Sequence, residues 1–256
     1  MLDPDWLVPA WQADGIGALM TTRAGGVSAA PFDTMNLRAG VGDDVGCVMQ
    51  NQRRLSAAIG ASPVYLDQVH GARVVRITAV DASSDAPVHQ ADASVATEPG
   101  IACTAQVADC LPVLLAAPQG RGVAAAHAGW RGLAGGVIEA ALVALCDAAR
   151  CEPRDVRAWL GACIGPRAFE VGRDVLDACG GRAERYVDLA PSGRPGKWFA
   201  DLPMLARDRL AAAGVEQVSG GTWCTFSEPS RFFSFRRDGR TGRMVAAIWI
   251  RPGARR

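Results

Sequence analysis

Three side chains that could bind a metal ion or act as nucleophiles stand beside apolar runs of the sequence. His70 and His127 each follow such a run, and Cys110 separates two of them. A side chain at the end of a buried strand is held rigidly but faces a turn, where a reactive site can open. We therefore predict that these three side chains converge on a single divalent ion, although they are far apart in the sequence.

Two imidazoles and one thiolate suit Zn²⁺, and three protein ligands leave a fourth tetrahedral position open, as in catalytic zinc sites. Such an ion keeps Cys110 deprotonated and lowers the pKa of a bound water towards ~7. Asp109 and Asp67 lie close enough in the sequence to accept a hydrogen bond from an imidazole N–H. The spacing matches no local zinc motif, so the residues alone leave open ordinary core and polar roles for the three side chains.

The charge balance and the apolar pattern argue against two classes of partner. Lys plus Arg number 27 and Asp plus Glu 26, so there is no basic excess to bind nucleic acid. No apolar run approaches the ~20 residues needed to span a bilayer, and the acidic, proline-containing start is unlike a signal peptide. The eight cysteines include no CxxC pair, which argues against a disulfide framework. We expect a cytoplasmic protein.

The hydrophobic periodicity predicts the elements that must position these side chains. Helices are expected over Asp44–Ile59, Ala134–Ala149 and Asp174–Cys179, and from Asp201 to a stop at Gly214. Strands are expected over Gly17–Arg23, Val64–Val69, Arg73–Thr78, Ile101–Val107, Leu111–Ala116, Val123–Ala126, Arg157–Leu160 and Met244–Ile250. Several strands follow one another before the central helix, which favours an α+β fold over a doubly wound sheet. We expect one domain over residues 1–256.

Three segments around the candidate ligands resemble the YfiH-like family, which also carries the labels multicopper polyphenol oxidase and laccase domain. They are Asp67–Gly71 (DQVHG), Ala108–Leu114 (ADCLPVL) and Ala126–Gly132 (AHAGWRG). Further matches are Thr21–Ser28, Met35–Leu37, Gly161–Pro166, Phe169–Gly172 and Phe233–Asp238. The matches run in order along nearly the whole chain, so together they are specific.

The resemblance implies a four-layer α/β/β/α sandwich with mixed sheets, similar to the catalytic domain of cytotoxic necrotizing factor. It also implies zinc bound at His70, Cys110 and His127. The implied activity is phosphorolysis of adenosine, inosine, guanosine and methylthioadenosine, together with adenosine deamination. Some members of the family are linked instead to peptidoglycan precursor editing. The chain departs from the family at Val107, where Thr is common, and at Arg167–Ala168, where Cys is frequent.

The laccase label can be tested by counting imidazoles. A blue-copper site together with a trinuclear copper centre needs many histidine ligands, and this chain has three histidines. We therefore predict no multicopper oxidase activity, and we expect any bound copper to be without function.

Phosphorolysis and deamination need further groups, for which the sequence offers candidates. Arg23, followed by two glycines, is the first candidate for phosphate, and Arg131 and Arg236 are the next. Asn36 is a candidate ribose contact, with a turn-stabilising role as the alternative. Asp109 or Glu170 could act as the acid–base group, although Glu170 could equally lie on the surface. Three aromatic side chains could stack on the base or belong to the core: Trp130, Phe169 and Phe235. His89 lies in a polar loop and is expected to be exposed and non-catalytic.

Two other functions remain open at this point. Cys110 and His127 could form a metal-free nucleophilic pair, as in a deamidase-like hydrolase. The chain could also be a non-catalytic zinc protein that binds nucleotides or a partner. The sequence gives no indication of the oligomeric state.

Overall fold

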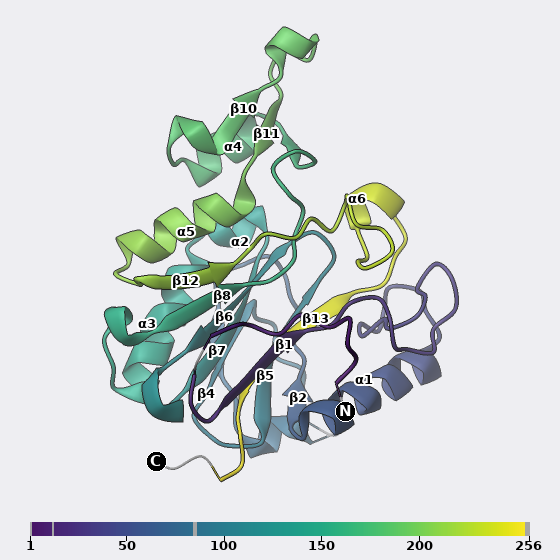
Figure 1. Cartoon of the computed structure of the whole chain (residues 1–256), viewed down its shortest axis with the longest axis vertical. Coiled ribbons are helices and arrows are strands. Elements are labelled where there is room, and N and C mark those ends of the chain that lie inside the picture. Colours follow the sequence, from purple (N-terminus) through teal and green to yellow (C-terminus); the bar gives the residue numbers. More distant parts are fainter. Residues whose placement is uncertain (1, 12, 84–85, 254–256) are drawn as a thin grey trace.

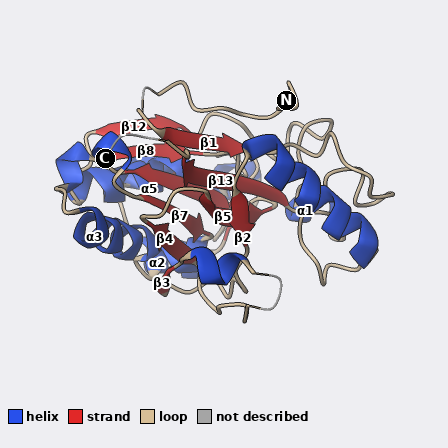
Figure 2. Ribbon diagram, turned by 90° about the horizontal axis from the view of Figure 1, so that it is seen from below, coloured by secondary structure: helices blue, strands red, loops and turns tan. Residues whose placement is uncertain are grey.

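Two mixed β-sheets packed face to face form the centre of the molecule, and helices cover both outer faces (Figures 1 and 2). This computed structural model describes residues 2–11, 13–83 and 86–253. The arrangement is the predicted α+β sandwich with α/β/β/α layers. Both sheets are mixed, since each contains parallel and antiparallel neighbours.

The first sheet has four strands in the order β1 (Ile16–Met20), β13 (Met244–Ile250), β5 (Ile101–Val107) and β2 (Ser62–Val64). β13 lies antiparallel to both β1 and β5, whereas β2 runs parallel to β5. Every residue of β1, β5 and β13 is buried, so these strands have no face in contact with water.

The second sheet has six strands in the order β12 (Gln217–Gly220), β8 (Arg157–Leu160), β6 (Leu111–Ala116), β7 (Val123–Ala128), β4 (Ala93–Ala96) and β3 (Val74–Arg76). A small third sheet joins β10 (Tyr186–Asp188), β11 (Trp198–Ala200) and β9 (Glu170–Val171). The strands of this third sheet project with α4 from one end of the molecule (Figure 1).

The helices begin and end where the sequence offers caps. α1 (Val45–Ile59) starts after Asp44, whose carboxylate accepts a hydrogen bond from the Cys47 N–H, and it stops at Gly60 in a left-handed conformation. The others are α2 (Trp130–Ala134), α3 (Val137–Ala149), α4 (Arg173–Cys179), α5 (Leu202–Ala212) and α6 (Phe235–Asp238). Across the ranges that the structure describes, the helices fall short of the length and apolarity that a membrane crossing needs.

Three apolar clusters occupy the three interfaces between the four layers. The cluster between the sheets includes Leu114 and Trp159 from the second sheet and Ile248 from the first. α1 covers the outer face of the first sheet through residues such as Leu55, while α3 and α5 cover the outer face of the second sheet. Burial of these faces is the main force that holds the layers together.

Most of the predicted elements are confirmed, and four strands match residue for residue. The predicted strand over Val64–Val69 is wrong beyond Val64, where β2 ends. Beyond β2 the backbone finds other partners: the Asp67 N–H donates to the carbonyl of His89, and the Asp92 carboxylate accepts from Val69, His70 and Gly71. The strands β4 and β9 to β12 were not predicted from the sequence.

The two sheets are connected directly at one edge. β5 of the first sheet ends at Val107, and β6 of the second sheet begins at Leu111. The three residues between them, Ala108 to Cys110, therefore cross from one sheet to the other. In the second sheet Pro112 pairs with His127, so this crossing also lies beside the end of β7.

Candidate metal and active site

The fold brings the three predicted ligands together at this edge of the sheets. The ligand atoms of His70, Cys110 and His127 lie within 4.8 Å of one another. The Cys110 Sγ is 3.8 Å from the His70 Nε2, and the two imidazole rings meet edge to face with their centroids 4.8 Å apart. His70 follows the extended segment after β2, Cys110 precedes β6, and His127 lies inside β7 rather than after it.

The donor set fits one small divalent ion. Tetrahedral zinc bonds of about 2.3 Å to sulfur and 2.0–2.1 Å to nitrogen would place a sulfur and a nitrogen ligand about 3.6 Å apart. The Cys110 Sγ and His70 Nε2 are separated by close to that distance. Two nitrogen donors and one sulfur donor are ligands for borderline metals such as zinc or copper, and the group leaves a coordination position for a further ligand.

Asp92 orients two of the three ligands, and the sequence did not single it out. Its Oδ1 accepts from the Nδ1 of His127 at 2.8 Å and from the backbone N–H of His70 at 2.8 Å. Its Oδ2 accepts from the N–H of Gly71 at 2.7 Å and of Val69 at 3.1 Å. Because Nδ1 of His127 is engaged in this way, Nε2 is the ring atom left for a metal ion or for Cys110.

The charges of the site stabilise one another. Burial by itself raises the pKa of the Cys110 thiol, but His127 and His70 outweigh it and hold the pKa at about 6. Burial by itself lowers the pKa of His127, but Cys110 and Asp92 raise it to about 9. Burial likewise opposes ionisation of Asp92, yet the hydrogen bonds from His127, Gly71 and His70 keep its pKa below the ordinary value.

Two site residues have a left-handed backbone that side-chain-bearing residues rarely adopt. φ is 62° at His70 and 96° at Asp109. The strain is held by surrounding bonds. The Asp109 carboxylate accepts from the Thr225 hydroxyl and from the backbone N–H of Arg236, both at 2.6 Å. The carbonyl of Asp109 accepts from the N–H of Ile164 at 2.9 Å.

Gly129 leaves the space that the ligands occupy. A Cβ at this position would lie 2.9 Å from the Cys110 Sγ and 3.0 Å from the His70 Cδ2. The backbone of Gly129 has φ −61° and ψ 161°, which any residue can adopt, so this glycine is required for space rather than for conformation. The match between its missing side chain and the two ligands indicates a site built for close approach.

A cavity of about 280 Å³ opens beside the ligands. Its lining includes the aromatic side chains of Trp130, Phe169 and Phe235, all three of which were proposed from the sequence as stacking candidates. The polar lining is formed by His70, Asp109, Cys110, Arg131 and Arg236. A small concave site with aromatic walls and a few converging polar groups is typical of sites for small organic ligands.

The predicted substrate-binding residues do not all lie at this cavity. Arg236 lines it and donates through its guanidinium to the carbonyl of Glu170 at 2.9 Å. The Glu170 carboxylate is not part of the lining and forms an ion pair with Arg194. Arg23 is also outside the lining, and its guanidinium binds the carboxylate and carbonyl of Asp33.

Asn36 is completely buried and bonds to the surrounding backbone, in agreement with the turn-stabilising alternative. It does not line the cavity either.

Two further expectations need correction, and one further residue belongs to the site. Asp67 is half exposed and lies 4.0 Å from Arg38, so it does not orient an imidazole, a role that Asp92 takes. His89 is only partly exposed, and its Nε2 forms a hydrogen bond with the Asp81 carboxylate at 2.7 Å. Thr225, which binds Asp109, lies in a segment without a sequence pattern. Neither Asp92 nor Thr225 could be identified locally, since each acts through residues far away in the sequence.

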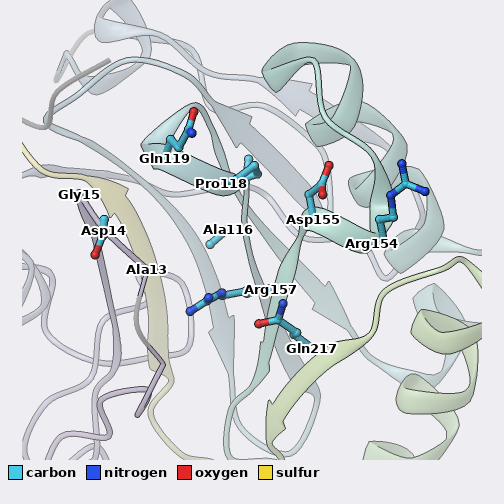
Figure 3. A pocket seen from close by; sticks show the side chains of 11 residues that line it. Ala13, Asp14, Gly15, Ala116, Pro118, Gln119, Arg154, Asp155, Arg157 and Gln217 are labelled. Atoms are coloured by element: carbon cyan, nitrogen blue, oxygen red, sulfur yellow. The ribbon is translucent and has the colours of Figure 1, made fainter.

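A larger cavity, of about 540 Å³, lies at the opposite end of β6 (Figure 3). Ala116 and Pro118 line it, whereas Cys110 precedes the first residue of the same strand. Its charged side chains come from Asp14, Arg154, Asp155 and Arg157. Its lining contains no histidine or cysteine, unlike that of the smaller cavity.

The sequence is similar to those of known proteins over almost the whole chain. A purine nucleoside phosphorylase of Pseudomonas aeruginosa is 48% identical over 247 residues, which cover 96% of this chain and 98% of that protein. The purine nucleoside phosphorylase YfiH of Escherichia coli is 45% identical over 251 residues, covering 95% and 98% of the two chains.

A solved structure matches this fold over almost the whole chain. A crystal structure of a Neisseria meningitidis protein superimposes with a TM-score of 0.88 at 42% identity, covering 96% of this chain and 99% of that one. The family described as "multi-copper polyphenol oxidoreductase laccase" matches residues 17–251. Together with the relatives named YfiH, this match shows that the chain belongs to the YfiH, or laccase-domain, family.

Proposed function

We propose that this chain is a zinc-dependent purine nucleoside phosphorylase that also deaminates adenosine. The observation that carries the proposal is the convergence of His70, Cys110 and His127 at the wall of a nucleoside-sized cavity. Relatives at 45–48% identity that are named purine nucleoside phosphorylase support the reaction class. Adenosine, inosine, guanosine and methylthioadenosine are the substrates that the family resemblance suggests.

The cavity offers what cleavage of a nucleoside requires. Trp130, Phe169 and Phe235 provide flat apolar surface against which a purine can stack. Arg131 and Arg236 provide positive charge for the developing negative charge of the leaving base or for phosphate. Positioning of two reactants within such a site supplies much of the rate enhancement of a bimolecular reaction.

His70, Cys110 and His127 would hold the zinc ion, with Asp92 fixing the orientation of His127. A bound zinc ion supplies a Lewis acid that polarises an oxygen atom close to it. For deamination we assign the proton transfer to Asp109, a residue of the cavity lining whose carboxylate also binds Thr225 and the backbone of Arg236. Glu170 is the weaker candidate, because its carboxylate is paired with Arg194 outside the lining.

The chain has three histidines, of which His70 and His127 gather with Cys110, and this donor set does not suit a multicopper oxidase in spite of the family label. The cytoplasm is the compartment that we infer, because all eight cysteines are free and reducing compartments keep thiols in that state.

One observation favours a second function, that of a metal-free Cys–His hydrolase with peptidoglycan precursors as an alternative class of substrate. Asp92, His127 and Cys110 form a carboxylate–imidazole–thiol series in which Asp92 orients the imidazole. Stoichiometric alkylation of Cys110 that abolishes turnover, combined with turnover unaffected by chelators, would favour this function over the first.

Metal analysis and an assay with inosine and phosphate on one preparation test the proposal. We expect about one zinc per chain, and hypoxanthine with ribose 1-phosphate as products. Cys110→Ala, His70→Ala and His127→Ala should each abolish phosphorolysis and lower the zinc content. His89→Ala is the matched control, since His89 pairs with Asp81 and does not line this cavity. Full activity of metal-free protein would refute the zinc requirement, and tight nucleoside binding without turnover would indicate a non-catalytic zinc protein.

A further inference from the structure

The buried side chain of Asn36 joins two arginine residues that are far apart in the sequence. Its Oδ1 accepts from the backbone N–H of Arg38 at 3.2 Å and from that of Arg243 at 2.9 Å. Its Nδ2 donates to the carbonyl of Arg38 at 3.1 Å and to the carboxylate of Asp43 at 2.8 Å. The N–H of Leu37 also donates to the carbonyl of Arg243 at 3.1 Å. Both arginines therefore start from one fixed point of the fold.

Arg243 connects this point to the candidate active site, although neither Arg243 nor Arg38 lines the cavity itself. Arg243 immediately precedes β13, whose first residue, Met244, pairs with Val107 at the end of β5. Arg243 therefore stands next to the crossing that leads to Cys110. Its guanidinium carbon lies 5.6 Å from the centre of the Phe235 ring, and Phe235 lines the cavity beside the ligands.

Neither of the two half-buried arginines has a close carboxylate partner among the described residues. Arg243 donates to the carbonyls of Thr241 and Gly242, and within the described ranges no carboxylate lies within 4.0 Å of it. Arg38 reaches Asp67 at 4.0 Å, where the carboxylate is half exposed. Burial and the positive charge of Arg38 lower the pKa of Arg243, whereas Cys110 and Asp109 raise it. The backbones of the two arginines are joined through Asn36 and the charge of Arg38 acts on Arg243, so an anion bound between the two guanidinium groups would relieve their repulsion.

We propose that Arg38 and Arg243 bind the phosphate co-substrate and that Asn36 is the residue that positions them both. This inference rests on the proposed phosphorolysis. In that reaction an oxygen of hydrogen phosphate forms a bond to the anomeric carbon of the ribose while the bond from that carbon to the purine nitrogen breaks. The electron pair of the broken bond stays on the purine nitrogen, which receives the proton of the hydrogen phosphate. The planar guanidinium forks suit the oxygens of such an anion.

Arg38→Gln and Arg243→Gln test the assignment through the two Michaelis constants. Loss of one or two charge-assisted hydrogen bonds should raise the KM for phosphate by about tenfold to a hundredfold. The KM for inosine and the zinc content should change by less than about threefold. Arg76→Gln is the control, because Arg76 is an exposed arginine on β3 that donates to Thr97. Thermal unfolding identifies a variant that fails to fold, and Arg243→Lys then keeps the charge while removing the fork.

Direct binding of radiolabelled orthophosphate separates this inference from the proposed function. Saturable binding to the wild type that is lost in Arg243→Gln supports the inference even if no nucleoside is cleaved. Phosphorolysis by the wild type with an unchanged KM for phosphate in both Gln variants refutes the inference and leaves the function intact. Inosine 5′-monophosphate forms a second arm: if it binds through Arg243 and orthophosphate does not, the site recognises a nucleotide and the assignment to the co-substrate is wrong.

Discussion

The carboxylate of Asp92 binds Nδ1 of His127 at 2.8 Å while the same oxygen accepts the backbone N–H of His70. One buried carboxylate therefore sets the direction of an imidazole from β7 and the position of an imidazole from a loop that follows β2. Asp92 orients the site in this way although it does not itself line the cavity.

Asp92→Asn should lower the affinity for zinc by about tenfold to a hundredfold, the usual cost of losing a group that orients a metal ligand. The amide places a donor against N–H groups that now donate to a carboxylate oxygen, including that of Gly71. Asp177→Asn is the control, because it removes an exposed carboxylate that pairs with Arg173 on α4. Competition with a chromogenic chelator measures the affinity, and equal affinities of the two variants would contradict the role of Asp92.

Gly129→Ala should reduce zinc binding and phosphorolysis at least tenfold while leaving the fold intact. The added Cβ would meet the Cys110 Sγ at 2.9 Å and the His70 Cδ2 at 3.0 Å, whereas the backbone angles of Gly129 suit alanine. Metal content and melting temperature should be measured together. A variant that keeps both its zinc and its activity would show that the ligands can move aside.

The Cys110 thiol should be unusually reactive once metal has been removed. Its pKa of about 6 means that the nucleophilic thiolate forms as the pH rises through about 6 and predominates at neutral pH. Alkylation by iodoacetamide should therefore increase to a plateau above pH 7 and be suppressed by zinc. Cys146, whose pKa burial raises to about 12, serves as the internal reference. Mass spectrometry of peptides from each pH gives the two rates, and an inflection near pH 9 at Cys110 would contradict the stabilisation by His127.

Leu114→Ala should lower the free energy of unfolding by roughly 2–5 kcal/mol, the range for a leucine removed from a packed core. Leu114 is completely buried between the two sheets, beside Trp159. Val143→Ala, at an α3 position that is 59% exposed, should cost much less. Urea denaturation of both variants provides the comparison. Equal losses would mean that the inter-sheet cluster contributes less than its burial indicates.

The sequence predicted the strands that coincide with an uninterrupted apolar run, because such a run is a local property. Leu111–Ala116 and Met244–Ile250 are examples in which the run and the strand coincide. β4 and β12 could not be found in this way, since polar residues interrupt Ala93–Ala96 and Gln217–Gly220 and both strands owe their ladders to distant partners. Tertiary pairing, rather than intrinsic propensity, decides such segments.

The same division holds for the candidate site. His70, Cys110 and His127 were selected because histidine is rare in this chain and because the three stand beside apolar runs. Asp92 is not recognisable in the same way, because it is no sequence neighbour of the ligands: the bond from His127 spans 35 residues. Arg23 was favoured by its glycine neighbours, but the nearby Asp33 accounts for its charge. The local sequence identifies reactive side chains better than it identifies the residues that orient them.

The left-handed backbone at His70 and Asp109 is a conformational strain that lowers the stability of the fold at the candidate active site. Glycine would adopt the same angles without strain, so Asp109→Gly could relax the turn only by discarding the bonds to Thr225 and Arg236. At both positions, therefore, the conformation that glycine would adopt freely is held by a residue whose side chain the site uses.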